Sequence, residues 1–377
     1  MIQQPQYTQT TSKYNFPLLT PEDTSNLPQR FIELSLRTIK NIHNRAATFQ
    51  PPQTITQDSN NEQQEEFTNI LQHGQTTLQL KTIPLTPKPD QTPVIAIDVS
   101  SIRLGETDTG ILLALRAATV WKQKGTAYRY LRFGPFPIHI TDQNQHDILS
   151  LFHEHNPVTQ KNSILHQLTS TPDLNQTQTR ITALLEKWLQ TQIAAQAQHS
   201  LILLDGNLTT ATNDPPNALT KLLETAHNNH NTILALTKIT RLRLNGHSIT
   251  SLANNSPKPS LLQLDGYQTP SAYSNIRQLG AIYVAKLNHS PYTFRLDIDA
   301  NLSGIQAVES VEHLIGNDLI TDGYPETLRL AHIYSTFTAN EVIGIQRFLA
   351  QAYGIKIVQR TNIRRLLFGP YGTKHES

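Results

Sequence analysis

The stretch "TPVIAIDVSSIRL", Thr92 to Leu104, decides the fold. Its first apolar run, rich in β-branched residues, stops at Asp98, and two serines follow one residue later. A short apolar run that ends in polar residues predicts a buried strand. In α/β sheets, functional groups gather where such strands end, because the loops there present side chains to a crevice. Asp98 is therefore the first candidate site residue.

Runs of the same kind recur along the chain and predict further strands. Two of them end in polar residues as the first one does, "SLILLDGNL" in Asp205 and "TILALTKITRL" in Lys238. Residues 177–198, "TQTRITALLEKWLQTQIAAQAQ", form the clearest predicted helix. The other predicted strands are "ILLALRAATVWKQ", "FGPFPIHIT", "GAIYVAKL" and "YTFRLDIDA". Strands interspersed with helices predict an α/β fold with a mixed central sheet flanked by helices.

The first part of the chain has a different sequence pattern from the rest. Residues 26–49 place Phe31, Leu34, Ile39 and Ile42 near helical spacing, which predicts one amphipathic helix. Residues 50–67, "QPPQTITQDSNNEQQEEF", are typical of a solvated linker. We therefore divide the chain into an N-terminal helical appendage with a polar linker, residues 1–82, and a main domain, residues 83–377.

The composition excludes several classes of functional site. The 377 residues carry a formal net charge of only +2, so overall charge does not indicate nucleic acid, although a local groove can still be basic. Without cysteine, disulfides, thiolate zinc sites and thiol nucleophiles are excluded, and a metal has to be held by carboxylates, histidines and water. The chain also lacks a secretory signal, a run of about 20 apolar residues, and the ATPase, serine hydrolase and zincin motifs. We expect a cytoplasmic protein with no membrane contact.

Asp98 and Asp205 are the strongest pair of candidates. Either one alone is more often a cap of a turn or helix, but two carboxylates at the mouth of one sheet repel each other unless a cation such as Mg²⁺ or Mn²⁺ lies between them. A two-metal site needs a further carboxylate, and Glu186 on the helix before Asp205 is the best supplier. The sequence alone favours the alternative, in which Glu186 pairs with Lys187 or Arg180 on a solvated surface.

Two further sets of residues have two interpretations each. Lys238 and Arg241 could bind phosphate, or they could form a solvated basic loop. Asp297 and Asp299 alternate with apolar residues, which favours the polar face of an edge strand over a site.

"DGYPETLRLAHIYS", Asp322 to Ser335, predicts a helix with Pro325 at its first position. It carries Tyr324 at its mouth and His332 two turns further, roughly 12 Å away along the axis, so the two side chains would line one groove at two depths. A histidine in such a place is, taken alone, more often a core residue with a backbone partner.

Four of these segments resemble motifs of the NurA nuclease family, in the family's order: "IAIDVSS", "LILLDGNL", "LTKITRL" and "DGYPETLRLAHIYS". The resemblance covers roughly residues 90 to 355, and the last motif is the most specific. One departure is Val99, where the family's first motif usually has glycine beside the aspartate. By this resemblance, residues 83–377 would be a NurA-like nuclease domain.

The resemblance implies a ribonuclease H-like fold and Mn²⁺-dependent (or Mg²⁺-dependent) hydrolysis of DNA. It implies 5′-to-3′ exonuclease and single-strand endonuclease activity in the repair of double-strand breaks, where DNA ends are resected. It also implies a homodimer that works with a HerA-type hexameric ATPase. Asp98 and Asp205 match the family's metal ligands, Tyr324 and His332 its C-terminal pair, and Glu186 is the best match for its glutamate.

The hypothesis is metal-assisted phosphodiester hydrolysis. Asp98, Asp205 and Glu186 would hold one or two ions, while His332 would ligate a metal or pass a proton to the departing oxygen. Tyr324 would position the phosphate or stack on an unpaired end base. Two rivals remain. One is a catalytically degenerate DNA-binding or assembly subunit of a DNA translocase complex. The other is a scaffolding protein, in which the strand-end groups would lie scattered.

Overall fold

The computed structural model describes residues 27–49, 79–122, 127–154, 173–211, 218–244, 247–265 and 276–358. The polar N-terminus before residue 27 and the predicted linker over residues 50–67 lie outside the described residues. The C-terminal stretch 360–372, which contains two adjacent arginines, lies outside them as well.

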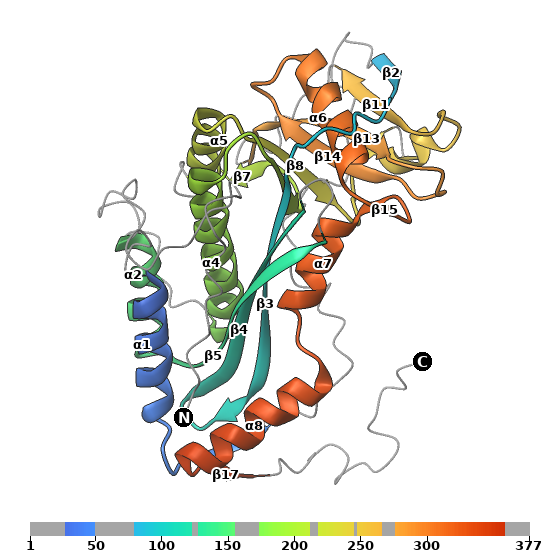
Figure 1. Ribbon diagram of the computed structural model, residues 1–377. Coiled ribbons are helices and arrows are strands. Elements are labelled where there is room, and N and C mark those ends of the chain that lie inside the picture. The colour runs from blue at the N-terminus through green and yellow to red at the C-terminus, as the bar shows by residue number, and fades with distance from the viewer. Residues whose placement is uncertain are drawn as a thin grey trace, which may run out of the picture.

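A mixed sheet forms the centre of the molecule (Figure 1). In the described part of the chain it has 11 strands, with the order β17-β1-β3-β6-β8-β14-β13-β11-β2, while β4 pairs with β3 and β5. This confirms the predicted α/β class with a mixed central sheet. The strands are β1 (Ala46–Phe49), β2 (Gln79–Pro84), β3 (Val94–Thr107), β4 (Gly110–Lys122), β5 (Arg129–Thr141), β6 (Leu201–Asp205), β8 (Thr232–Thr237), β11 (Ser260–Asp265), β13 (Gly280–Lys286), β14 (Phe294–Asp299) and β17 (Lys356–Ile357).

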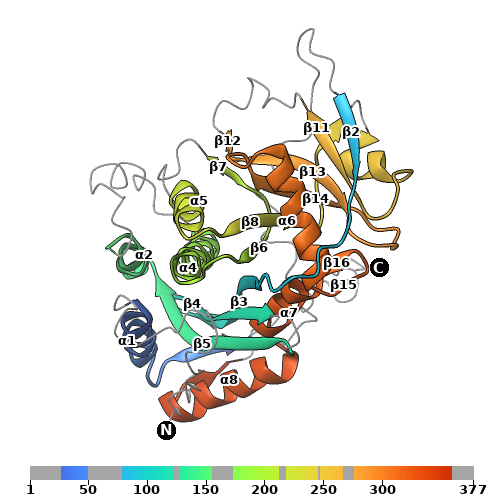
Figure 2. The ribbon, with the colours of Figure 1, turned by 45° about the horizontal axis from the view of Figure 1, so that its top comes forward.

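Helices cover both faces of this sheet (Figure 2). They are α1 (Leu27–Lys40), α2 (Gln145–Glu154), α4 (Leu174–Gln196), α5 (Ala218–Asn228), α6 (Gly304–Asn317), α7 (Glu326–Ser335) and α8 (Ala339–Tyr353), with the 3₁₀ helix η3 (Ile249–Ala253). Three two-stranded ribbons complete the fold: β7 (Thr209–Ala211) with β12 (Ile276–Gln278), β9 (Arg243–Leu244) with β10 (His247–Ser248), and β15 (Ile320–Thr321) with β16 (Tyr324–Pro325). Among the described residues, no helix is both long and apolar enough to cross a membrane.

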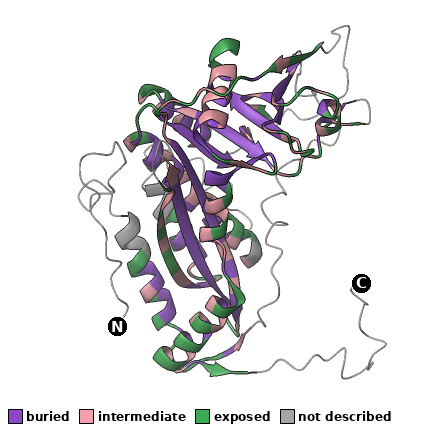
Figure 3. Cartoon of the chain, turned by 45° about the vertical axis from the view of Figure 1, so that its right-hand side comes forward, coloured by how far each residue is buried: buried purple, intermediate pink, exposed green. Residues whose placement is uncertain are grey.

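The first half of β3 lies at the centre of the sheet, and its burial explains the apolar run (Figure 3). It pairs antiparallel with β4 and parallel with β6, which in turn runs parallel to β8. The register places Ile97 opposite Leu204. Because these three strands run in one direction, their carboxyl ends open at the same edge.

Alternate residues of β3 face opposite sides, as the pleat requires. Ile95, Ile97 and Val99 pack in the cluster that includes α4 and α5. Val94 and Ala96 pack in the cluster that includes α6 and α7. Asp98 continues the second series, so its carboxylate belongs to the α7 side.

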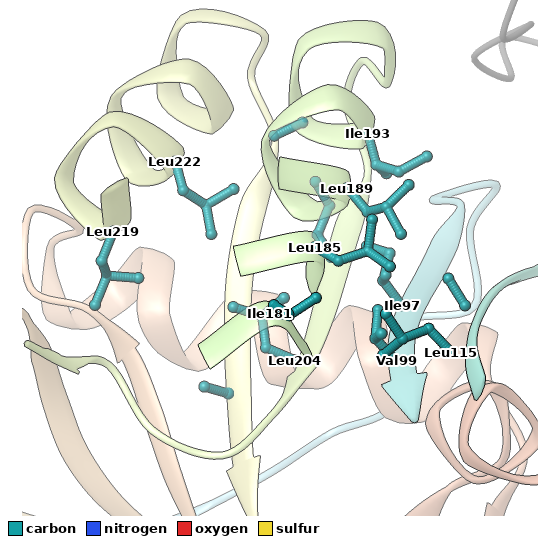
Figure 4. Close-up of a cluster of buried hydrophobic side chains, with 14 of the residues drawn as sticks. Ile97, Val99, Leu115, Ile181, Leu185, Leu189, Ile193, Leu204, Leu219 and Leu222 are labelled. Atoms are coloured by element: carbon teal, nitrogen blue, oxygen red, sulfur yellow. The ribbon is translucent and has the colours of Figure 1, made fainter. Parts of the chain in front are cut away.

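The long helix α4 follows from one apolar stripe. Its buried residues recur every four positions, at Ile181, Leu185, Leu189 and Ile193, and they meet β3 and β4 in one core cluster (Figure 4). This spacing is that of a helix with one face on a core.

The apolar face of helix α1 is buried in the main core. Leu34 packs in the α4 cluster, and Ile39 and Ile42 pack in a cluster that includes residues of β3, β4 and α8. From the same early part of the chain, β1 pairs with β3 and β2 pairs with β11. The predicted domain boundary after residue 82 stays a prediction.

The entrance to α7 differs by one residue from its prediction. Asp322 and Gly323 both have positive φ, as a tight two-residue turn between β15 and β16 requires, and the helix begins at Glu326 with Pro325 as its N-cap. Proline offers no side-chain cap, and the carboxylate of Asp318 accepts the Thr327 N–H at 3.0 Å instead.

Candidate metal centre

Three predicted residues come together at the carboxyl edge of the sheet. Asp98 and Asp205 each follow a paired residue of the β3–β6 ladder, and α7 packs across β3 and β4 above them. One ligand atom from each of Asp98, Asp205 and His332 lies within 4.8 Å of the other two. The grouping follows from strand register and from the position of one helix, so a scatter of these groups is excluded.

Asp98 is held by hydroxyl groups. Its Oδ2 accepts a hydrogen bond from the Ser335 hydroxyl and a longer one, at 3.4 Å, from Ser100 Oγ. His332 Nδ1 lies 3.6 Å from the same oxygen. Burial alone would raise the pKa of Asp98, but His332 and Ser335 outweigh it and lower the pKa. The lowered pKa favours the ionised form of the Asp98 carboxyl group, which is the form that binds a metal ion.

His332 pairs with a carboxylate rather than with a backbone group alone. Its contact with Asp98 raises the pKa of the imidazole, while burial and the charge of Lys238 oppose this rise. The alternative of an ordinary core histidine does not describe this arrangement, because the ring is half-buried and adjoins two acids.

Lys238 brings a positive charge to the same place. It follows the end of β8, and its Nζ lies 2.7 Å from Asp205 Oδ2. Burial raises the pKa of Asp205, and the charge of Asp98 adds to the rise while Lys238 counteracts it. The charge of Asp98 thus disfavours the ionised form of Asp205, and a cation close to both carboxylates stabilises them.

Glu186 stands beside this group but outside the set of three. It lies on α4, is half-buried, and accepts a hydrogen bond of 2.8 Å from Gln190 Nε2. Burial raises its pKa to about 8, with the charges of Asp98 and Asp205 adding and that of Lys187 opposing. This burial does not fit a fully solvated surface pair, although the charge of Lys187 acts on Glu186. A metal-binding role for Glu186 stays a prediction.

Two predicted site residues, Tyr324 and Arg241, are not among the three grouped residues. Tyr324 is only 9% exposed and packs edge-on against Phe294 at a centroid distance of 5.3 Å, so its ring offers little surface to a base. Its role in the site stays a prediction. Arg241 is exposed in the loop after β8 and is not one of the three grouped residues.

The sequence interpretation missed Ser335 and Gln190. Each had a signal in the helical spacing, since Ser335 follows His332 by three residues and Gln190 follows Glu186 by four, which places each pair on one helix face. Val99 is buried against the α4 side, away from Asp98, so the departure from the family motif concerns packing.

Asp297 and Asp299 do not form the polar face of an edge strand, which is a correction. β14 lies between β8 and β13, and the Asp297 side chain is 0% exposed. Asp297 Oδ1 accepts a hydrogen bond of 2.7 Å from Arg295 Nε. The alternation that suggests an exposed face therefore reflects a buried ion pair.

The donor set of the three grouped residues fits a divalent cation. Carboxylate oxygens are the preferred ligands of Mg²⁺ and Mn²⁺, and an imidazole nitrogen is tolerated by Mn²⁺ and other transition metals. Burial, with the charges of the neighbouring acids adding to it, raises the pKa of Asp205 and of Glu186, and a bound cation would favour their ionised forms.

No protein-family model matches this chain, and no curated protein matches its sequence. Among solved structures, the chain is similar to the NurA nuclease from Sulfolobus solfataricus, with 16% identity and a TM-score of 0.40 over 71% of this chain and 87% of that one. It is also similar to human endonuclease V, with 12% identity and a TM-score of 0.30 over 68% of this chain and 86% of that one. A Ciona intestinalis endonuclease V bound to DNA matches with 11% identity and a TM-score of 0.34, over 87% and 100% of the two chains. At TM-scores below 0.5 these likenesses do not determine what this chain does.

Proposed function

We propose that this protein is a metal-dependent DNA nuclease of the NurA type. The observation that carries the proposal is the convergence of Asp98, Asp205 and His332, whose ligand atoms lie within 4.8 Å of one another. Lys238 beside them supplies a cation for the phosphate of a substrate.

The chemistry divides among the residues as follows. When bound, Mn²⁺ or Mg²⁺ supplies an activated water and stabilises charge on the phosphate oxygens. Asp98 and Asp205 would hold the ion, with Glu186 as a further ligand from α4. When the substrate binds, Lys238 would leave Asp205 and pair with a phosphate oxygen of the DNA. Arg241 would contact the DNA strand at a nucleotide further from the metal centre. His332 would either join the ligands or donate a proton to the departing oxygen.

The finer features of the proposal come from the sequence resemblance. They are a ribonuclease H-like fold, 5′-to-3′ exonuclease and single-strand endonuclease activity, a role in double-strand-break end resection, a homodimer, a HerA-type ATPase partner and a cytoplasmic location. The antiparallel strands β5, β4 and β3, followed by β6 and β8 parallel to β3, support the ribonuclease H-like assignment.

The test is cleavage of a 5′-labelled single-stranded oligodeoxynucleotide in Mn²⁺. We expect Asp98→Asn and Asp205→Asn to abolish cleavage, because the amide keeps the shape of the side chain and removes the charged ligand. The matched control is Asp90→Asn, since Asp90 also pairs with a histidine, His313, at 2.8 Å but is not one of the grouped residues. Metal-dependent cleavage by a folded Asp98→Asn variant at the wild-type rate would contradict the proposal.

A second candidate function has one observation in its favour. The Lys238 ammonium already balances Asp205 at 2.7 Å, which is the arrangement expected of a degenerate site in which lysine replaces the metal. That protein would bind DNA as an assembly subunit of a translocase complex without cutting it. DNA binding by the wild type, with no cleavage in Mn²⁺ or Mg²⁺, is the result that selects this function.

A further inference from the structure

Two large apolar side chains stand exposed where β8 ends and β14 begins. Ile239, in the loop that leaves β8, is 61% exposed, and Tyr292, in the loop that enters β14, is 58% exposed. β8 and β14 are antiparallel neighbours, with Thr237 opposite Arg295 (Figure 1). The two loops therefore lie at the same edge of the sheet, which is also the edge that carries the metal centre.

The alternation of side chains places Tyr292 on the metal side of that edge. Leu236 of β8 and both Leu296 and Phe294 of β14 pack in the cluster on the α7 side. Lys238 continues the first series and contacts Asp205, while Tyr292 continues the second, two residues before Phe294. Asp205 is level with Leu236 of β8 and Leu296 of β14. Two strand spacings across and four residues along put Tyr292 at about 16 Å from Asp205, a few nucleotides along a single strand.

The backbone of Tyr292 is fixed while its ring stays accessible. Its N–H donates to Ser290 Oγ at 3.3 Å, and the Ser290 N–H donates to Asn288 Oδ1 at 2.9 Å. Asn288 Nδ2 in turn donates to the Ile320 carbonyl at 2.9 Å, which ties this loop to the β15–β16 hairpin. An exposed ring on an ordered loop is a preformed contact surface, so binding costs little ordering entropy.

Charge on the neighbouring loop selects the occupant. Residues 237–243, "TKITRLR", contain three cations and no acid, and Arg241 and Arg243 are exposed. Cations that follow a backbone, together with an exposed aromatic ring, form the usual combination for single-stranded nucleic acid. A duplex end keeps its bases stacked on each other, whereas an unpaired strand offers a free base.

We propose that Tyr292 is the platform on which an unpaired nucleobase of the substrate strand stacks. This inference rests on the proposed nuclease function and names its substrate as a single strand gripped by a base as well as by phosphates. It also moves the stacking role from the buried Tyr324 to a tyrosine whose ring is accessible.

The experiment measures binding without metal, so that no cleavage occurs. Fluorescence anisotropy is recorded with an oligothymidylate and with an abasic oligonucleotide of the same length, in EDTA. We expect Tyr292→Ala to weaken oligothymidylate binding about 5- to 150-fold, to leave abasic binding unchanged, and Tyr292→Trp to retain wild-type affinity. The matched control is Tyr130→Ala, because Tyr130 is a tyrosine of similar exposure, 52%, that stacks on Tyr334 of α7 from β5.

Two results would overturn the inference while leaving the nuclease proposal intact. One is equal oligothymidylate affinity for the wild type and a folded Tyr292→Ala variant, and the other is equal wild-type affinity for the two oligonucleotides. Wild-type protein that neither binds nor cleaves any DNA would overturn the nuclease proposal and this inference together. DNA cleavage by the wild type in Mn²⁺, measured in parallel, distinguishes failure of the stacking inference alone from failure of the nuclease proposal.

Discussion

At the scale of single residues, the metal centre depends on how Asp98 is held. Ser335 is fully buried on α7, where its hydroxyl donates to the Asp98 carboxylate and its Oγ lies 3.0 Å from the His332 carbonyl oxygen. A third contact, 3.0 Å long, joins Ser335 Oγ to Ser100 Oγ. Groups that orient a metal ligand in this way matter nearly as much as the ligand itself.

Removal of this hydroxyl is expected to weaken the metal site. We predict that Ser335→Ala lowers Mn²⁺ affinity about 10- to 100-fold, because Asp98 loses a partner that fixes its orientation. Isothermal titration calorimetry measures the effect. The matched control is Ser310→Ala, since Ser310 is likewise a buried helical serine that donates to a carbonyl one turn back, Ala307, at 2.7 Å, but it contacts no candidate ligand. Equal Mn²⁺ affinity in the Ser335→Ala and Ser310→Ala variants would show that the Asp98 contact has no such role.

The sequence predicts the grouped residues because each carries a local signal, a strand end for Asp98 and Asp205 and a helical motif for His332. It does not predict that Tyr324 is buried, because burial depends on Phe294, which reaches it from another strand. The buried pair Arg295–Asp297 is missed for a similar reason. Its alternation suits an exposed face equally well, and only the neighbouring strands decide between the two.

At the scale of elements, α8 is anchored to the sheet by one carboxylate. Glu341 closes a capping box with Thr338 at the start of the helix. Its Oε1 also lies 3.0 Å from Arg116 of β4 and 2.9 Å from Arg132 of β5. Burial alone would raise the pKa of Glu341, but the two arginines and the cap outweigh it and lower the pKa to about 2.

This anchor makes stability depend on pH in a defined window. A carboxyl group with a lowered pKa contributes stability above its unfolded pKa, near 4.5, and loses it as the pH falls toward about 2. We predict that Glu341→Gln lowers the free energy of unfolding by about 2 kcal/mol at pH 7, and that the difference from wild type shrinks between pH 4.5 and 2. Urea unfolding at pH 7, 4 and 3 measures it. A difference that stays constant over this range would rule out the charge of Glu341 as its source.

Elements with a strong apolar pattern are predictable from sequence, and short ones that depend on distant partners are not. The apolar pattern indicates β3, β4, β6, β8 and α4, because an element buried on one face or on both has apolar residues at regular spacing or in a continuous run. It does not indicate that the four residues of β1 join the sheet, since their pairing with β3 and β17 is a property of the whole fold.

At the scale of the whole molecule, the site lies at a gap in the sheet. On one side of β3, β6 pairs as far as Ile97 and β1 pairs only from Gly105 onward, so no described strand covers residues 98–104 there. α7 lies on one face and α4 on the other. This gap explains how the charges of Asp98 and Asp205 act on Glu186, which lies on α4, while His332 adjoins the acids from α7.

The central claim is that Asp98, Asp205 and His332 form a divalent metal site. Electron paramagnetic resonance of free Mn²⁺ during a titration tests it most directly, because the signal of the free ion falls as the ion binds. We predict that the wild-type protein binds Mn²⁺ and that Asp205→Asn weakens binding more than about 100-fold, with Asp90→Asn unchanged. Equal Mn²⁺ binding by the wild type and a folded Asp205→Asn variant would contradict the claim, as would a wild type that binds no Mn²⁺.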